Sequence, residues 1–221
     1  WSHPEAATSI QPIEIMGGVL EFVSDSPGHA EDLVNTVDYT GFAALYADTH
    51  TATNPGRQWD QILMEYTSGT RARPVWGNGD IDYHYNRKGV QLKDILSILL
   101  VKERTQEAVL EALASGRMYA VRGEQEQISL RDFTVESGGM VAGAGEEVTS
   151  TGGFTVHVKI EKMHGASQDV RVQLIKSGVV AAEVEGLTPL DFIHVDSIDI
   201  GEMEYVRLLA FGRGSRITSN P

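Results

Sequence analysis

The spacing of apolar residues changes once along this chain, near Gly123, and that change limits the folds that the chain can adopt. Before Gly123, segments with helical spacing alternate with short apolar segments, as a parallel α/β structure requires. After it, apolar and polar residues alternate with a period of two, most clearly over residues 154–161. Short strands of this kind, separated by Gly-rich turns, indicate an antiparallel β-sandwich. The pattern therefore predicts two domains, residues 1–123 and residues 124–221.

The first domain is expected to contain both helices and buried strands. Helical spacing of apolar residues covers residues 30–37, 58–68 and 105–115. Short apolar segments that predict strands lie at residues 74–76 and 95–101. Helices and strands that alternate in this way are typical of a parallel sheet covered by helices.

The helix over residues 105–115 has the best-defined ends. Thr105 is a favoured N-cap residue, and Glu107 places a negative charge in the first turn. Gly116 is a typical C-terminal stop, because glycine adopts the left-handed conformation without strain. The buried stripe of this helix is expected at Val109, Leu110 and Leu113.

The second domain is expected to contain strands joined by Gly-rich loops. The strands are predicted near residues 128–136, 154–160, 170–174, 179–184, 192–200 and 204–211. The Gly-rich segment at 138–145 does not follow a strand and open a helix, as a phosphate-binding loop must. It is therefore predicted to be an ordinary loop of the β domain.

An Asp-x-His pair, Asp82 and His84, follows a Gly-Asn-Gly segment at residues 77–79, whose glycines allow a tight turn. Residues two apart on an extended segment point to the same side, so both side chains can bind one ion. A carboxylate and an imidazole suit a divalent zinc, manganese or iron ion. Asp80 and Asp82 share one face by the same geometry, and spacing alone leaves Asp80 as a candidate.

The segments around this pair resemble the end of a PHP domain, from the polymerase and histidinol phosphatase superfamily, in its exported CehA/McbA-like branch. The resemblance extends over residues 1 to about 122 and includes LVKERTQEAVLEALASGRMYA at residues 100–120. The family's last metal-binding motif, a Gly-rich turn followed by Asp-x-His, falls on Asp82 and His84. This register favours Asp82 over Asp80.

The N-terminus resembles a second family motif. Ser2-His3-Pro4-Glu5 is similar to the His-Pro motif of PHP domains, which implies that His3 is a further metal ligand. Residues 13–18 resemble the next strand of the family, an apolar-Glu-apolar run that ends in small residues. A streptavidin-affinity tag also begins Trp-Ser-His-Pro, although this chain departs from the tag at Glu5. Under the alternative interpretation, His3 is a terminal residue without a ligand role.

The resemblance implies a specific fold and activity. The fold would be an incomplete, distorted (βα)7 PHP barrel over residues 1–123, followed by an antiparallel β-sandwich over residues 124–221. The resemblance implies a bacterial protein that is secreted or periplasmic. Its activity would be hydrolysis of phosphoesters or related esters by a water molecule that divalent metal ions activate. No catalytic residue is assigned.

Relatives supply most of their metal ligands before the His-Pro motif. The chain is therefore expected to be part of a longer polypeptide, in which a missing N-terminal segment or another chain completes the barrel. The alternative is a non-catalytic extracellular structural or interaction protein that keeps a degenerate PHP fold.

Composition narrows the classes of partner. The 31 acidic and 18 basic residues give a net charge of −13, which argues against binding to nucleic acid. Arg87 and Lys88 follow the metal motif and are candidates for binding an anionic group of a small substrate, with a solvated loop as the alternative role.

The absence of cysteine excludes thiol catalysis, Cys-ligated zinc and disulfides within the chain. No run of about eighteen apolar residues predicts a membrane span.

Overall fold

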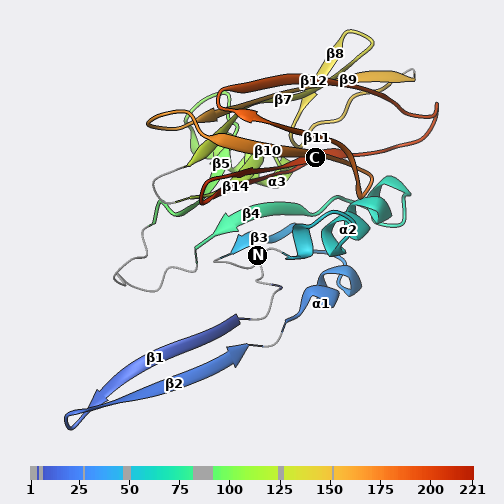
Figure 1. The fold of residues 1–221 in the computed structure, drawn as a ribbon. Helices are drawn as coiled ribbons and strands as arrows, with labels where there is room; N and C mark the ends of the chain where they lie inside the picture. The colour runs from blue at the N-terminus through green and yellow to red at the C-terminus, as the bar shows by residue number, and fades with distance from the viewer. Residues whose placement is uncertain are drawn as a thin grey trace.

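The computed structural model describes residues 4, 7–26, 28–46, 51–81, 92–123, 127–150 and 152–221. Within them the strands form four sheets: a hairpin, a parallel pair, a six-stranded sheet and a four-stranded sheet. The two larger sheets lie as layers above the parallel pair and its helices in Figure 1. No helix in these ranges is long and apolar enough to cross a membrane.

The six-stranded sheet has the strand order β11-β10-β13-β14-β6-β5, and its neighbouring strands are all antiparallel. Its strands are β5 (Ile95–Leu99), β6 (Met118–Gly123), β10 (Asp169–Lys176), β11 (Val179–Leu187), β13 (Val206–Gly212) and β14 (Ser215–Ser219). The four-stranded antiparallel sheet has the order β12-β9-β7-β8. Its strands are β7 (Ile128–Ser137), β8 (Met140–Gly143), β9 (Gly153–Lys162) and β12 (Leu190–Ser197).

The main core contains apolar side chains from both of these sheets. In β9, Val156, Val158 and Ile160 are buried and alternate with partly exposed polar residues. In β10, Val172 and Leu174 enter the same core. The period of two in the sequence thus places one face of each strand in the core, since successive side chains of a strand point to opposite faces.

A smaller α/β unit packs beside the two sheets. It consists of α1 (Ala30–Asn35), β3 (Gly41–Tyr46), the 3₁₀ turn η1 (Thr51–Thr53), α2 (Gln58–Thr67) and β4 (Trp76–Asp80). Strands β3 and β4 are parallel. In the core of this unit the rings of Phe42 and Trp59 meet edge to face, with centroids 5.5 Å apart.

The helix α3 (Gln106–Ser115) has the predicted ends. The hydroxyl of Thr105 accepts a hydrogen bond from the backbone N–H of Ala108 at 3.2 Å. Gly116 adopts the left-handed conformation, with φ of 74°. The predicted buried stripe is wrong, because Leu110 is 56% exposed and Ala112 is the buried residue of this helix.

The predicted fold class, an incomplete (βα)7 barrel followed by a separate sandwich, is wrong. Within the described residues only β3 and β4 are parallel, and a barrel requires a ring of parallel strands. The sequence placed a helix between two apolar segments and so predicted a parallel crossover. Instead, Gly116 and Arg117 turn the chain from α3 directly into β6, which pairs antiparallel with β5 and with β14. The division into domains at residue 123 stays a prediction.

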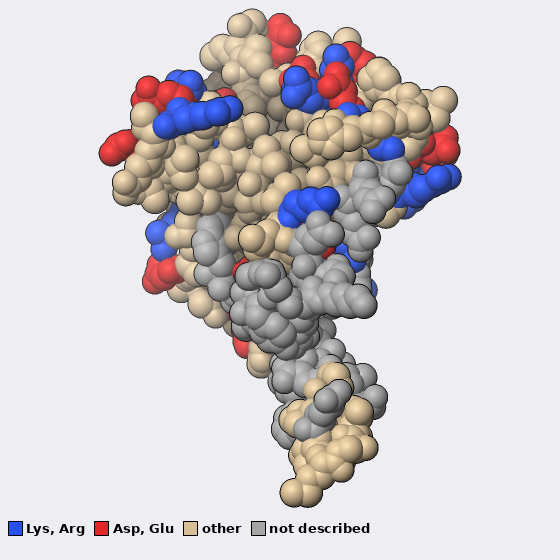
Figure 2. Space-filling model, turned by 90° about the vertical axis from the view of Figure 1, so that its left-hand side faces the viewer, with Lys and Arg blue, Asp and Glu red and all other residues tan. Residues whose placement is uncertain are grey.

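A hairpin of β1 (Ala7–Ile15) and β2 (Gly18–Ser26) projects from the rest of the molecule (Figures 1 and 2). Met16 and Gly17 form its turn with φ of 46° and 83°, and positive φ at both central residues is typical of a tight hairpin turn. The sequence had predicted one strand through residues 13–18, which this turn interrupts. The exposed apolar side chains of the hairpin are Ile13, Ile15, Met16, Val19, Leu20 and Val23.

Candidate functional site

The carboxyl ends of β3 and β4 lie at the same edge of the parallel pair. Gly41 lies opposite Trp76 at the start of the pair, and Tyr46 lies opposite Asp80 at its end. The two strands therefore end side by side at this edge. In α/β structures this edge is the usual place for chemistry, because neighbouring loops can bring side chains together there.

Strand β4 is held on one side by a buried asparagine near the C-terminal end of the described chain. Asn220 is fully buried, and its Oδ1 accepts a hydrogen bond from the backbone N–H of Gly77 at 2.7 Å. Its Nδ2 donates to the carbonyl oxygens of Gly77 and Met118, each at 3.1 Å. One amide side chain thus links β4 to β6 without leaving a polar group unsatisfied.

A serine holds the other half of β4. The backbone N–H of Gly79 donates to Ser97 Oγ at 2.9 Å, and the same hydroxyl donates to the carbonyl oxygen of Gly79 at 3.1 Å. The next residue beyond the strand, Ile81, packs against a small core cluster that contains Leu45, Ile95 and Ala120. The backbone is therefore fixed up to the residue before Asp82.

The glycines of the Gly-Asn-Gly segment have a different role from the predicted one. They lie within β4 rather than in a turn. A Cβ atom on Gly77 would lie 2.6 Å from the Cβ of Ala44, and one on Gly79 would lie 2.7 Å from the carbonyl oxygen of Leu96. Glycine is needed here because β4 packs closely against its neighbours.

The predicted metal ligands His3, Asp82 and His84 lie outside the described residues, as do the predicted substrate-binding residues Arg87 and Lys88. Asp80, the alternative ligand, is the last residue of β4 and is partly exposed. Among the residues that the structure describes, no group of three or more His, Asp or Glu side chains could hold a metal ion.

A buried ion pair joins the α/β unit to the six-stranded sheet. Asp60 of α2 and Arg207 of β13 are both fully buried. Arg207 Nε donates to Asp60 Oδ1 at 2.6 Å and its Nη2 donates to Oδ2 at 2.8 Å. The backbone N–H of Gly56 also donates to Oδ2, at 2.7 Å. Each carboxylate oxygen has a donor in the protein, so this pair is a structural link rather than a reactive group.

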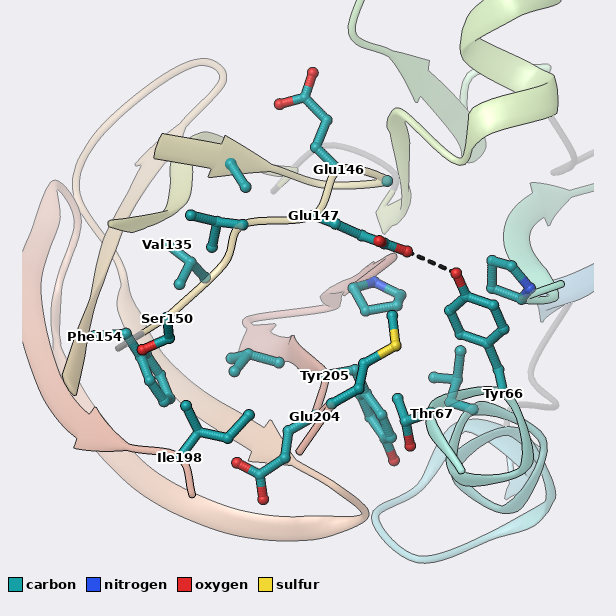
Figure 3. A pocket seen from close by; sticks show the side chains of 18 of the residues that line it. Tyr66, Thr67, Val135, Glu146, Glu147, Ser150, Phe154, Ile198, Glu204 and Tyr205 are labelled. Atoms are coloured by element: carbon teal, nitrogen blue, oxygen red, sulfur yellow. Dashed lines mark hydrogen bonds between the residues drawn. The ribbon is translucent and has the colours of Figure 1, made fainter. Parts of the chain in front are cut away.

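A cavity of about 740 Å³ lies between α2, the segment after β8 and the segment before β13 (Figure 3). Its apolar and aromatic lining includes Leu63, Trp76, Phe133, Phe154, Ile198 and Tyr205. Four glutamates also line it: Glu146, Glu147, Glu202 and Glu204. The sequence analysis missed this cavity, because its walls come from distant segments that share no motif.

A hydrogen bond between an aromatic and an acidic side chain joins two parts of the cavity wall. The Tyr66 hydroxyl donates to Glu147 Oε1 at 2.6 Å, as the dashed line in Figure 3 shows. Burial and the hydrogen bond with the Glu147 carboxylate raise the pKa of Tyr66 to about 12, so the phenol remains a donor at neutral pH. Two other wall residues contact a lysine that lies outside the lining: Lys176 Nζ is 3.2 Å from Glu204 Oε2 and 5.6 Å from the centre of the Phe154 ring.

Comparison with protein-family models, curated proteins and solved structures finds no match for this chain. Its function is therefore inferred from its own residues.

Proposed function

We propose that this chain contributes ligands to the divalent-metal site of a hydrolase that cleaves phosphoesters or related esters. The site would lie at the edge where β3 and β4 end. The observation that supports it is the parallel pairing of these strands, with Tyr46 opposite Asp80, directly before the Asp-x-His pair in the sequence. The proposal needs no complete barrel.

The environment of β4 suits a metal-binding strand end. Asn220 and Ser97 fix the backbone of β4 from two sides, and Ile81 is anchored in a core cluster immediately before Asp82. A metal site on a rigid element loses less entropy on binding than one on a free loop, and it holds its ligands closer to the productive geometry. This rigidity favours a binding role for the residues that follow.

The chemistry follows from the proposed ligands. Asp82, His84 and His3 would bind zinc, manganese or iron, and further ligands would come from another segment or chain. The metal would lower the pKa of a bound water and polarise the ester bond. Arg87 and Lys88 would then bind the anionic group of the substrate.

The test compares metal content and phosphodiester hydrolysis in two double variants of the protein. Asp82→Ala/His84→Ala removes both proposed ligands and is expected to lose bound metal and hydrolysis of bis(p-nitrophenyl) phosphate. Asp191→Ala/His164→Ala changes the same residue types at exposed positions elsewhere and is expected to keep both. A full complement of metal in the Asp82/His84 variant would contradict the proposal.

A non-catalytic interaction protein is the second candidate function. The projecting β1–β2 hairpin favours it, because an isolated two-stranded hairpin is marginally stable in water and this one exposes several large apolar residues. This candidate predicts that the protein binds neither zinc, manganese nor iron tightly and hydrolyses no phosphodiester, whichever residues occupy positions 82 and 84.

A further inference from the structure

We propose that the cavity between α2, the segment after β8 and the segment before β13 binds a small organic cation. The ligand would have an ammonium or guanidinium group attached to an apolar body. This site shares no residue with the proposed metal site, so either proposal can fail without the other.

The size and lining of the cavity fit a small molecule. Its volume of about 740 Å³ lies within the range of about 300–1,000 Å³ for ligand pockets. Apolar side chains from both larger sheets and from α2 form its walls, and a few polar groups converge on them. This combination of apolar walls and few polar groups is typical of sites that bury an apolar body and orient one polar group.

The negative charge of the lining favours a positively charged ligand. Four glutamates line the cavity, and none of the described lining residues is Lys, Arg or His. Three of the glutamates already have a partner in the protein. Lys176 pairs with Glu204, and Glu146 Oε2 accepts a hydrogen bond from the backbone N–H of Gly143 at 3.0 Å and points away from the cavity in Figure 3. Tyr66 donates to one oxygen of Glu147, so the other oxygen of Glu147 and the carboxylate of Glu202 attract a ligand of opposite charge.

Glu147 is the carboxylate that is best placed for this role. Its hydrogen bond with Tyr66 crosses from the segment after β8 to the end of α2 and fixes the orientation of the carboxylate. A carboxylate held in this way loses little side-chain entropy on binding a ligand. Tyr66 therefore acts as a positioning residue for Glu147.

The aromatic side chains of the wall add a second attraction for cations. Lys176 already places its ammonium group over the ring of Phe154, with the nitrogen 5.6 Å from the ring centre. Trp76 and Tyr205 lie in the same lining. Aromatic faces attract cations through their quadrupole, and sites for organic ammonium ions combine such rings with carboxylates.

The experiment uses benzyltrimethylammonium as the probe, with benzyl alcohol and phenylacetate as neutral and anionic analogues. Isothermal titration calorimetry and the tryptophan fluorescence of the protein, to which Trp76 in the lining contributes, are expected to show saturable binding of the cation and at least tenfold weaker binding of both analogues. Glu147→Gln is expected to weaken binding of the cation at least fivefold, and Glu147→Gln/Glu202→Gln still further. Glu185→Gln makes the same charge change at an exposed position on β11 and is expected to leave binding unchanged.

Two outcomes would overturn the proposal. The first is the absence of saturable binding of benzyltrimethylammonium to a folded wild-type protein. The second is equal binding of the cation by wild type and Glu147→Gln/Glu202→Gln, with thermal unfolding as the check that both are folded. Because both glutamates are exposed, these substitutions are not expected to prevent folding.

Discussion

At the scale of single residues, a few buried contacts fix how the parts of this molecule fit together. Asp60 and Arg207 are far apart in sequence, yet their ion pair links α2 to β13 inside the protein. Gly77 also fixes how two elements fit together, because the absence of a Cβ atom allows β4 to pack closely against β3. Asp60 had no feature in the sequence that distinguished it from an exposed helical carboxylate, because its partner lies on another element.

Replacing Asp60 tests the buried ion pair. Asp60→Ala leaves the Arg207 guanidinium buried without a counter-ion, and the free energy of unfolding is expected to fall by about 3–5 kcal/mol. Urea unfolding followed by circular dichroism measures the change. The matched control is Glu111→Ala, which breaks a pair with Arg117 in which Glu111 is exposed and is expected to cost less than about 1 kcal/mol. Equal effects of the two substitutions would refute the structural role of Asp60.

Adding a methyl group at Gly77 tests the close packing of β4. Gly77→Ala is expected to lower the free energy of unfolding by about 1–3 kcal/mol, because the new Cβ overlaps that of Ala44. Ala44→Gly in the same protein removes the overlap and is expected to restore part of the stability. Gly153→Ala is the control, since no atom lies within 4 Å of a Cβ at that position. A double variant no more stable than Gly77→Ala would show that the overlap is not the cause.

At the scale of elements, the sequence predicted the ends of a helix and the alternation within a strand, but it did not predict which strands pair. The ends of α3 follow from Thr105 and Gly116, which act within one turn of the helix. The alternation in β9 follows from its own residues. The partners of β5 and β6 could not be predicted, because a short apolar strand has the same pattern in a parallel and an antiparallel sheet. The proposed metal ligands lie outside the described residues, and they stay a prediction.

The contact between α2 and the segment after β8 predicts a pH effect at Tyr66. Burial and Glu147 raise the pKa of the phenol to about 12, so the folded state binds its proton more tightly than the unfolded state. The stability that Tyr66 contributes is therefore present below pH 10 and lost as the pH rises from 10 to about 12. Glu147→Gln is expected to lower this pKa towards 10 without reaching it, because burial remains.

The titration is measured from the chemical shift of the Tyr66 Cζ carbon in protein with labelled tyrosine. Glu185→Gln serves as the control and is expected to leave the pKa of Tyr66 unchanged. A wild-type Tyr66 that titrates near 10 would contradict the contact with Glu147.

At the scale of the whole molecule, the structure combines two antiparallel sheets, a parallel β-α-β unit and a projecting hairpin (Figure 1). The sheets and the β-α-β unit are joined by buried contacts such as the hydrogen bond between Asn220 and Gly77. The hairpin differs, because six of its apolar side chains, those at residues 13, 15, 16, 19, 20 and 23, are exposed and residues 1–56 contain no Lys or Arg. The molecule thus has one packed body and one arm suited to contact with another surface.

The exposed hairpin predicts self-association of the isolated chain. Ile13 and Leu20 lie opposite each other and are 47% and 61% exposed. Ile13→Thr/Leu20→Thr places β-branched residues at both positions, which suits the strands, and removes one opposed apolar pair, so association is expected to weaken at least tenfold, or by about 1.4 kcal/mol. Sedimentation velocity over a range of concentrations measures this. Val195→Thr, an exposed apolar residue of β12, is the control, and an equal effect there would exclude the hairpin as the contact.

The central claim is that a divalent metal binds at the edge where β3 and β4 end, and a manganese titration followed by NMR tests it most directly. Paramagnetic Mn²⁺ broadens the signals of nearby nuclei. At the lowest metal concentrations the amide signals of Tyr46, Asp80 and Ile81 are expected to broaden before those of acidic surface strands such as β12. The effect is expected to disappear in Asp82→Ala/His84→Ala. Broadening that begins elsewhere, or that persists at this edge in the double variant, would contradict the account.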